Sequence, residues 1–411
     1  MPRPSPFHAR TRELCLTYKW KDWAGYHAVC LYGLSPDREY NAVRQGAGLL
    51  DVTPLYKYEV RGSEAGEFLT RLTVRELTSL GVGRMTYLCW CDGDGKVIDD
   101  GTVARLGTEH YRLTSAAPAF HWLSRHAEPF NVTIEDVSDA MAAVALQGPT
   151  SRDILRQICD TDVDALKFFS ITQTQYASGK GWLSRTGYTG DLGYELWVPN
   201  DQALALWDAL MDAGKTRGIE PIGLDTLDVT RVEAGFILRT VDYVPANEAM
   251  IEAQKSSPFE IGLGWTVKLD ERPPFIGMEA LLAERKQGSK WALVGLDIDW
   301  PALEQLYAEY GLPPRVPSAA WRSNIPVYFE GRQVGRATSG TWSPILKKNL
   351  ALATVEADAA KPGTVLHIEW TAEWARRTLP AVVTKTPFFD PPRKRTTPHP
   401  GAPSSLRAPK K

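Results

Sequence analysis

Residues 184–199 read SRTGYTGDLGYELWVP and join a glycine-rich turn to an apolar strand. The three glycines of this stretch let the backbone turn sharply and approach a flat ligand closely. Tyr188 and Tyr194 offer an aromatic face or a hydroxyl, and Glu195 offers a bidentate acceptor for paired N–H groups of a heterocycle. The alternative is a glycine-rich hairpin that carries only an ordinary salt bridge. In either case the stretch predicts a turn between two strands.

Short strands and helices alternate on both sides of this stretch. Helical periodicity and runs of β-branched residues bounded by Gly and Pro predict the following elements. Helices are expected at 63–73, 118–129, 146–158, 201–214 and 224–235, and strands at 56–61, 109–116, 130–138, 140–149, 171–186 and 194–199. A hairpin of two strands with a turn at 92–95 is expected over 85–106. From Trp291 onward, short strands separated by Gly and Pro predict a β-barrel-like or jelly-roll-like module with an insertion at 299–321. The fold class is therefore α+β, with antiparallel sheets.

The length of 411 residues predicts two to three domains of roughly 150 residues each. The composition, 43% hydrophobic and 23% charged, is ordinary for a globular protein, and no apolar run approaches the roughly 18 residues of a membrane span. The first residues show no secretory signal, so we expect a cytoplasmic protein without a membrane partner. The five cysteines are scattered and form no C-x-x-C pair, so no zinc or redox site is predicted.

The net charge of −2 is unevenly distributed. Residues 391–411 contain six of the 47 basic residues and no acidic one, which leaves 41 basic and 49 acidic residues, or −8, in the rest of the chain. An acidic body without an RNA- or DNA-binding motif argues against nucleic acid as a partner. Because the C-terminal end is rich in Pro, Ser, Lys and Arg, we expect residues 389–411 to form a disordered basic tail without a part in catalysis.

A second candidate site is the hairpin that contains GKVIDDG at 95–101. Asp99 and Asp100 follow two apolar β-branched residues, so their carboxylates are expected on opposite faces of the strand. One of them would then face the interior or a cleft, where desolvation raises its pKa and suits it to be a base or to hold a protonated amine. Two surface acids at a strand end are the alternative. An EF-hand is disfavoured because Lys96 and Val103 stand where oxygen ligands are needed, and no dinucleotide or P-loop motif occurs.

Seven motifs occur in the order, and at about the spacing, of the aminomethyltransferase family, which is typified by the T-protein of the glycine cleavage system. They are LLDVTPL (49–55), GKVIDDG (95–101), ALQGP (145–149), SRTGYTGDLGYELWVP (184–199), LDVTRVEAG (227–235), GLGWTVKLD (262–270) and VGRATSGTWSPILKKNLALATV (334–355). The chain resembles this family over roughly residues 30–385.

The resemblance implies a cloverleaf of three domains that binds tetrahydrofolate as a co-substrate in a central channel and loads a one-carbon unit onto it. Residues 1–52 and 146–285 would form a folate-binding domain, 53–145 a second α+β domain that carries Asp99, and 286–388 the C-terminal barrel. No metal is required for this chemistry.

The resemblance also implies roles for five residues. Asp99 matches the carboxylate proposed to hydrogen-bond or deprotonate the folate amine, and Tyr87 matches a tyrosine that lines the same channel. Glu195 matches the acid that binds the aminopyrimidine edge of the pterin, with Tyr188 as its neighbour in the channel wall. Arg231 matches the arginine of an R-L-E-A-G motif that is expected near the folate.

Three departures from the family pattern concern the one-carbon donor. Pro54 stands where T-proteins usually have a histidine, residues 236–243 replace a Tyr-Gly and acidic stretch, and the insertion and the tail are extra. These differences put a lipoyl-bound donor in doubt more than they do the folate. The sequence identifies neither the donor, nor the oxidation level of the product, nor the oligomeric state.

Three functions therefore remain open. The first is an aminomethyltransferase that acts on an aminomethyl-lipoyl carrier protein, and the second is a folate-dependent N- or O-demethylase of a small molecule. Tyr18, Trp20, Trp23 and Tyr26 suit the second, since aromatic faces bind methylated ammonium groups, although simple packing explains them too. The third is a non-enzymatic folate-binding factor for iron–sulfur assembly, which the absence of cysteine from residues 236–250 disfavours.

Overall fold

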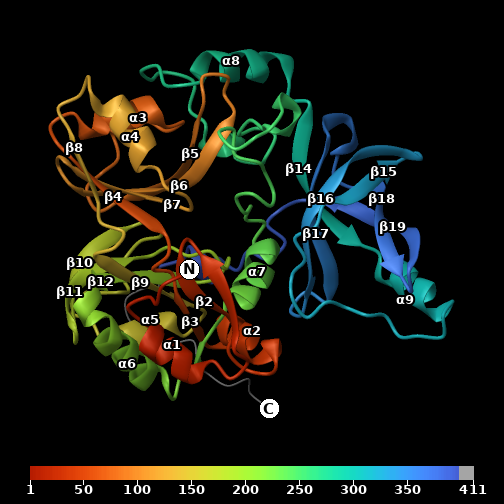
Figure 1. Ribbon diagram of the computed structural model, residues 1–411, viewed down its shortest axis with the longest axis horizontal. Helices are drawn as coiled ribbons and strands as arrows, with labels where there is room; N and C mark the ends of the chain where they lie inside the picture. The colour runs from red at the N-terminus through yellow and green to blue at the C-terminus, as the bar shows by residue number, and fades with distance from the viewer. Residues whose placement is uncertain (398–411) are drawn as a thin grey trace.

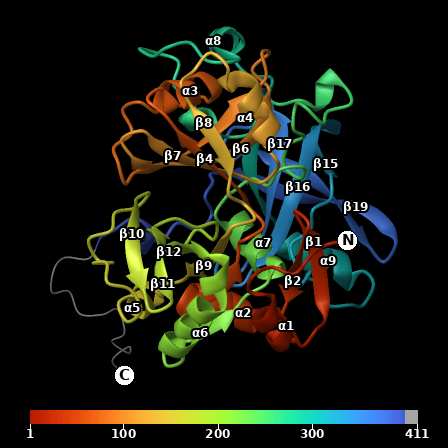
Figure 2. The ribbon, with the colours of Figure 1, turned by 60° about the vertical axis from the view of Figure 1, so that its left-hand side comes forward.

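The structure of the protein, a computed structural model, describes residues 1–397. Two α+β lobes are stacked, and a β-barrel lies beside them (Figure 1). In the view turned by 60° the two lobes remain stacked, and α7 and the barrel strand β16, which contact each other, lie near the middle of the molecule (Figure 2). None of the helices in this part of the chain combines the length and the apolar character that crossing a membrane would require.

The first lobe is built on a sheet in the order β10-β11-β12-β9-β3-β13, antiparallel except for the pair β13 and β3. Its strands are β3 (Ala47–Asp51), β9 (Met141–Gln147), β10 (Ile171–Tyr176), β11 (Gly179–Ser184), β12 (Gly193–Pro199) and β13 (Ile219–Pro221). Its helices are α1 (His8–Leu14), α2 (Pro36–Gln45), α5 (Ser151–Leu155), α6 (Ala203–Gly214) and α7 (Leu224–Glu233). A hairpin of β1 (Lys19–Trp23) and β2 (Tyr26–Leu31) precedes α2 and contacts α7.

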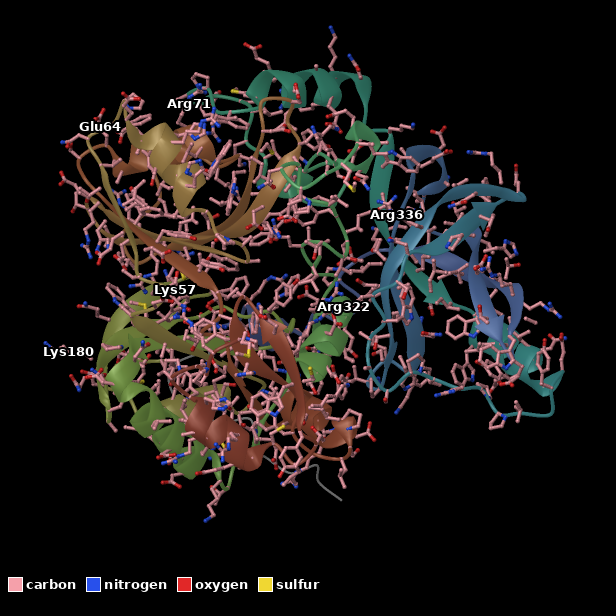
Figure 3. The ribbon with its side chains drawn as sticks, in the orientation of Figure 1. Lys57, Glu64, Arg71, Lys180, Arg322 and Arg336 are labelled. Atoms are coloured by element: carbon pink, nitrogen blue, oxygen red, sulfur yellow. The ribbon has the colours of Figure 1, made fainter. Side chains whose placement is uncertain are left out.

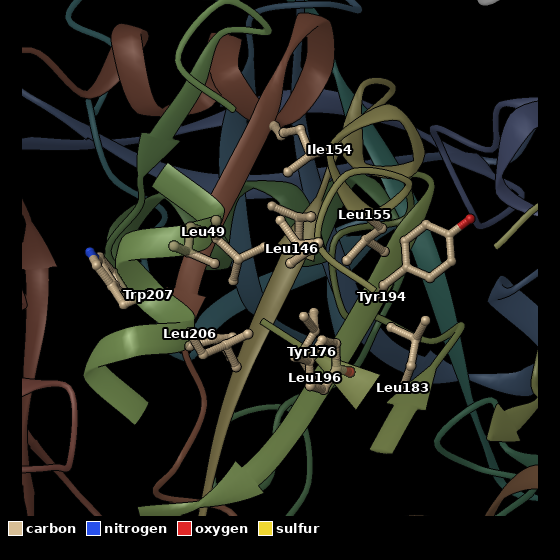
Figure 4. Close-up of a cluster of buried hydrophobic side chains, with 14 of the residues drawn as sticks. Leu49, Leu146, Ile154, Leu155, Tyr176, Leu183, Tyr194, Leu196, Leu206 and Trp207 are labelled. Carbon is tan, nitrogen blue, oxygen red and sulfur yellow. The ribbon is translucent and has the colours of Figure 1, made fainter. Parts of the chain in front are cut away.

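Alternation along β12 separates a core face from a face that carries polar groups. Tyr194 and Leu196 pack with Leu206 of α6 in a large apolar cluster (Figure 4). Glu195 and Trp197 point to the opposite face, because successive side chains of a strand alternate. Tyr194 is fully buried, so its predicted role as a stacking face for a ligand is wrong.

The second lobe is an antiparallel sheet in the order β5-β6-β7-β4-β8 with two helices packed on one face. Its elements are β4 (Tyr56–Arg61), α3 (Ala65–Leu72), β5 (Met85–Cys91), β6 (Val97–Gly107), β7 (His110–Ser115), α4 (Phe120–Ala127) and β8 (Thr133–Asp136). Residues 243–285 pack against the hairpin of β5 and β6, where Tyr243 and Ile261 share an apolar cluster with Cys89 and Cys91.

The third lobe is a closed barrel of six strands in the order β14-β17-β16-β15-β18-β19, which confirms the predicted α+β class with a C-terminal barrel. Its elements are β14 (Trp291–Ile298), α9 (Trp300–Ala308), β15 (Ile325–Phe329), β16 (Arg332–Ser343), β17 (Lys348–Glu356), β18 (Val365–Ala372) and β19 (Ala375–Thr384); α8 (Met278–Gln287) precedes it. Helix α9 lies within the expected insertion and buries Leu303 and Leu306 in the barrel core.

Arginine side chains join the lobes. Arg112 of the second lobe lies 5.6 Å from the ring of Trp182 and 5.5 Å from the ring of Trp197, both in the first lobe. Arg322, which precedes β15, forms a 2.6 Å ion pair with Asp228 of α7 and lies between the first lobe and the barrel (Figure 3).

The structure corrects three details of the expected organisation. Residues 243–285, assigned to the first domain, pack against the hairpin of β5 and β6 in the second lobe. Residues 141–145, assigned to the second domain, belong to β9 in the sheet of the first lobe, because β9 pairs with β3 and β12. Residues 389–397, expected to be disordered, lie against the first lobe, where Arg393 binds Asp191 and Lys394 is buried. The remainder of the predicted tail, 398–411, lies outside the described residues.

Candidate active site

Asp99 is a buried carboxylate in β6, at a point where the strand is irregular. The register with β5 shifts between Trp90 and Cys91, and such a bulge redirects neighbouring side chains. Asp99 is 3% exposed. Its Oδ1 accepts the backbone N–H of Asp100 at 2.9 Å, and its Oδ2 accepts the N–H of Ala117 at 3.2 Å.

Asp100 lies beside it and accepts two tyrosine hydroxyls. Tyr87 donates to Oδ2 at 2.6 Å and Tyr243 donates to Oδ1 at 2.6 Å. The hydroxyl of Tyr243 is also 3.5 Å from Oδ1 of Asp99, and Nε of Arg239 is 3.4 Å from the same atom. The two carboxylates therefore belong to one polar cluster. Tyr87, which the sequence paired with Asp99, binds Asp100 instead.

The environment raises the pKa values of both carboxyl groups. Burial, reinforced by the charge of Asp100, raises the pKa of Asp99 to about 7, although Arg239 opposes the shift. Burial also raises the pKa of Asp100, against the hydrogen bonds from Tyr243 and Tyr87. Two interacting carboxyl groups titrate as a pair, and the raised pKa values make this pair a better proton acceptor than an ordinary carboxylate.

Aromatic rings border the carboxylate pair. Tyr87 stacks on Trp265, with ring centroids 6.0 Å apart; Trp265 is 61% exposed, and the guanidinium of Arg75 lies 5.7 Å from its ring centroid. Tyr188, in the glycine-rich turn, stacks on Phe236 at 5.4 Å. Burial raises the pKa of Tyr188, and the charge of Asp100 adds to that shift, so the two groups lie within electrostatic reach of one another.

Glu195 lies in the same sheet as the turn, on the face opposite α6. It pairs with Ala145 of β9 and Ser184 of β11. Burial raises the pKa of Glu195 to about 7, partly offset by a hydrogen bond from Thr186. Within residues 1–397 no lysine or arginine forms an ion pair with it. A half-buried carboxyl group without a cation is a suitable acceptor for N–H donors of a ligand.

Arg231 occupies a different kind of position. It is 1% exposed, and its guanidinium donates to Asp228 at 2.7 Å, Asp242 at 2.6 Å and Ser339 of the barrel at 2.7 Å. Because Asp242 also accepts the hydroxyl of Thr338 at 2.6 Å, this cluster joins the first lobe to the barrel. The structure thus brings Asp99, Tyr87 and Tyr188 into one region. Arg231 lies instead in the buried cluster that joins the first lobe to the barrel.

Four site residues were not identified from the sequence: Phe236, Arg239, Tyr243 and Trp265. The first three lie in the segment whose departure from the family pattern was noticed, but no local pattern shows that it reaches β6. Trp265 is part of the GLGWTVKLD motif, which could have pointed to it. The described residues contain no group of three or more His, Cys, Asp or Glu side chains arranged to hold a metal ion.

Comparisons with known proteins agree with this architecture. The profile of the GCVT N-terminal domain matches residues 17–271, and that of the glycine cleavage T-protein C-terminal barrel domain matches residues 311–390. The chain is 34% identical over 373 residues to the aminomethyltransferase of Bacillus pumilus (strain SAFR-032), covering 90% of this chain and 94% of the relative. It is 36% identical over 356 residues to the aminomethyltransferase of Geobacillus thermodenitrificans (strain NG80-2), covering 85% and 89%.

A solved structure shows the same fold. The crystal structure of glycine cleavage system aminomethyltransferase T from Bartonella henselae has a TM-score of 0.80 at 23% identity, and covers 95% of this chain and 99% of its own. The profiles and the curated relatives together extend over both α+β lobes and the barrel. The chain therefore belongs to the aminomethyltransferase, or glycine cleavage T-protein, family of transferase enzymes.

Proposed function

We propose that this protein transfers a one-carbon unit from a donor to tetrahydrofolate. The observation that carries the proposal is the pair Asp99 and Asp100. Burial raises the pKa values of both carboxyl groups, and the stacked rings of Tyr87 and Trp265 lie beside them. A folate amine is nucleophilic only when it is unprotonated, and a carboxylate near neutrality can accept or return its proton. Positioning of the two reactants then supplies the rest of the catalysis.

The remaining residues suit folate binding. Glu195 would accept the paired N–H donors of the pterin, and Tyr188 and Tyr87 would line the path between the pterin and the carboxylate pair. We assign Arg231 a supporting role, because its donors already bind Asp228, Asp242 and Ser339.

The donor is the open part of the proposal. An aminomethyl group on a lipoyl carrier protein is the first candidate, since curated relatives are named aminomethyltransferases. A small methylated molecule is the second candidate, because Arg239 and Tyr243 of the divergent segment reach the carboxylate pair, where the donor must enter. The aromatic residues of the β1–β2 hairpin give the second candidate little support, because their rings already contact other side chains. Trp20 packs on His8 and His27, and the guanidinium of Arg3 lies over the ring of Tyr26.

Two measurements test the proposal. Titration calorimetry of the purified protein with tetrahydrofolate must show binding, and its absence refutes both donors at once. An assay with each donor then separates them: methylene-tetrahydrofolate formed from an aminomethyl-lipoyl carrier supports the first, and 5-methyl-tetrahydrofolate formed from a methylated small molecule supports the second.

A further inference from the structure

The last described residues, 386–397, return from the barrel to the first lobe; we name them the C-terminal strap. Phe389 donates its backbone N–H to the carbonyl of Glu233 at 2.8 Å, and its ring lies 4.3 Å from the guanidinium of Arg44. The matched C-terminal barrel profile ends at residue 390. Residues 391–397 of the strap thus lie beyond the matched region.

Two glycines leave room for the strap. A Cβ on Gly235, at the end of the LDVTRVEAG motif, would lie 2.7 Å from Cβ of Thr386. A Cβ on Gly295 of β14 would lie 2.6 Å from the ring of Phe388. Real side-chain carbons do not approach so closely, so these two positions require the absence of a side chain for the strap to lie where it does.

Two cations of the strap bind buried groups around the glycine-rich turn. Nε and a terminal nitrogen of Arg393 donate to the two carboxylate oxygens of Asp191 at 2.6 Å and 2.7 Å. Asp191 is fully buried and belongs to the turn that carries Tyr188. Such a bidentate pair fixes both position and direction of the carboxylate. Arg393 therefore holds the glycine-rich turn through Asp191.

Lys394 lies beside Phe236, in the second of the two stacked aromatic pairs of the site. It is 6% exposed, and its Nζ lies 4.9 Å from the ring centroid of Phe236, on which Tyr188 stacks. A desolvated ammonium over an aromatic face is attracted to the ring. From the turn itself Arg185, which is fully buried, donates to the carbonyls of Lys394 at 3.2 Å and Thr396 at 2.7 Å. Contacts therefore run in both directions between the turn and the strap.

We propose that the C-terminal strap is a positioning element of the active site, in which Arg393 and Lys394 hold the glycine-rich turn and Phe236 in the arrangement that receives folate. The proposal rests on the proposed function for its ligand. The part of it that concerns structure, the ordering of residues 185–192 by the strap, depends only on the contacts described above.

The test uses the full-length protein and single substitutions in the strap. Arg393→Gln removes the bidentate pair but leaves Asp191 with Arg44 at 3.4 Å, and Lys394→Met keeps the volume but removes the cation. Arg395→Gln is the matched control, because Arg395 pairs with Asp390 inside the strap and forms no ion pair with the turn. Lys394→Arg, which restores a cation for the ring of Phe236, tests for rescue.

Three quantities are measured: the Kd of tetrahydrofolate by calorimetry, hydrogen exchange of residues 185–192 and 236–240, and the Tm. We expect Arg393→Gln and Lys394→Met to raise the Kd about tenfold and to speed exchange in both segments, as coupling through packed side chains allows. Arg395→Gln should match the wild type, and Lys394→Arg should restore most of the affinity.

The outcomes separate this proposal from the function. Binding and exchange as in the wild type for both variants overturn the positioning role, as does a lower Tm with unchanged exchange and Kd. If the wild type binds no tetrahydrofolate, the proposed function is wrong, and the exchange data alone decide whether the strap orders the turn: faster exchange in the variants supports it, and unchanged exchange refutes it.

Discussion

Replacing Arg231 by methionine tests whether this arginine joins two lobes or contacts folate. Methionine preserves an unbranched side chain but removes every donor, so Asp242 loses its ion pair. Asp242 has no other ion-pair partner within residues 1–397, and its side chain is fully buried. Asp228, in contrast, keeps its 2.6 Å pair with Arg322.

The magnitude follows from these contacts. Removing one partner of a buried ion pair costs about 3–5 kcal/mol, because the other charge stays buried. The lower end, about 3 kcal/mol, is expected here, since Asp242 still accepts hydrogen bonds from Ser339, Thr338 and the backbone N–H of Leu238. The matched control is Arg322→Met: Arg322 is 31% exposed and its partner Asp228 keeps Arg231, so the cost should stay below about 1 kcal/mol.

Urea unfolding of both variants, followed by tryptophan fluorescence, measures the two costs, and calorimetry measures tetrahydrofolate binding. We expect Arg231→Met to unfold at clearly lower urea concentration than the wild type and than Arg322→Met. Folate affinity should fall only slightly, because Arg231→Met weakens the contact between the first lobe and the barrel and removes no contact to folate. A wild-type unfolding midpoint combined with lost folate binding would refute the reasoning and return Arg231 to the folate site.

Three further substitutions test the other parts of the site. Asp99→Asn should lose most turnover. Because burial raises the pKa of Asp99 from 3.8 to about 7, the stability of the wild type falls as pH rises between these values, so in urea unfolding at pH 8 the variant should be the more stable of the two. Glu195→Gln should weaken tetrahydrofolate binding in calorimetry by about 1.5–3 kcal/mol. It should also abolish the rise in affinity between pH 6 and 8 that ionisation of Glu195 near pH 7 gives the wild type. Gly235→Ala, at φ +68°, should lower the Tm by more than Gly288→Ala, at φ +87°, because only the first Cβ meets a neighbour; equal losses would show that the strap adjusts freely.

Local patterns were sufficient for much of the fold and for part of the site. The apolar run after the glycine-rich turn predicted the strand at 194–199, and the run at 95–101 indicated an acidic pair with a buried member. Other elements were missed although they carry signals. Helix α2 begins after Ser35, whose hydroxyl accepts the N–H of Asp37, with Pro36 in the first turn, which is a recognisable N-terminal cap.

Family membership and the α+β class with a barrel follow from the order of the motifs, and the comparisons and the structure confirm both. The roles of Asp99, Tyr87, Tyr188, Glu195 and Arg231 remain predictions. The substitutions described above can decide each of the two carboxylate roles and the role of the arginine separately.

The sequence by itself determined most of the elements and the candidate carboxylates, because these depend on spacing between near neighbours, and the order of its motifs determined the family. Only the tertiary structure decided that Tyr243 donates a hydrogen bond to the acidic pair and that the donors of Arg231 bind groups at the contact with the barrel. It also decided that residues 389–397 lie on the first lobe. The composition of that end predicted disorder, because the segment has little apolar surface to bury. Its order comes instead from a cation that meets the buried Asp191, a partner about 200 residues earlier in the chain, and no local pattern records such a pair.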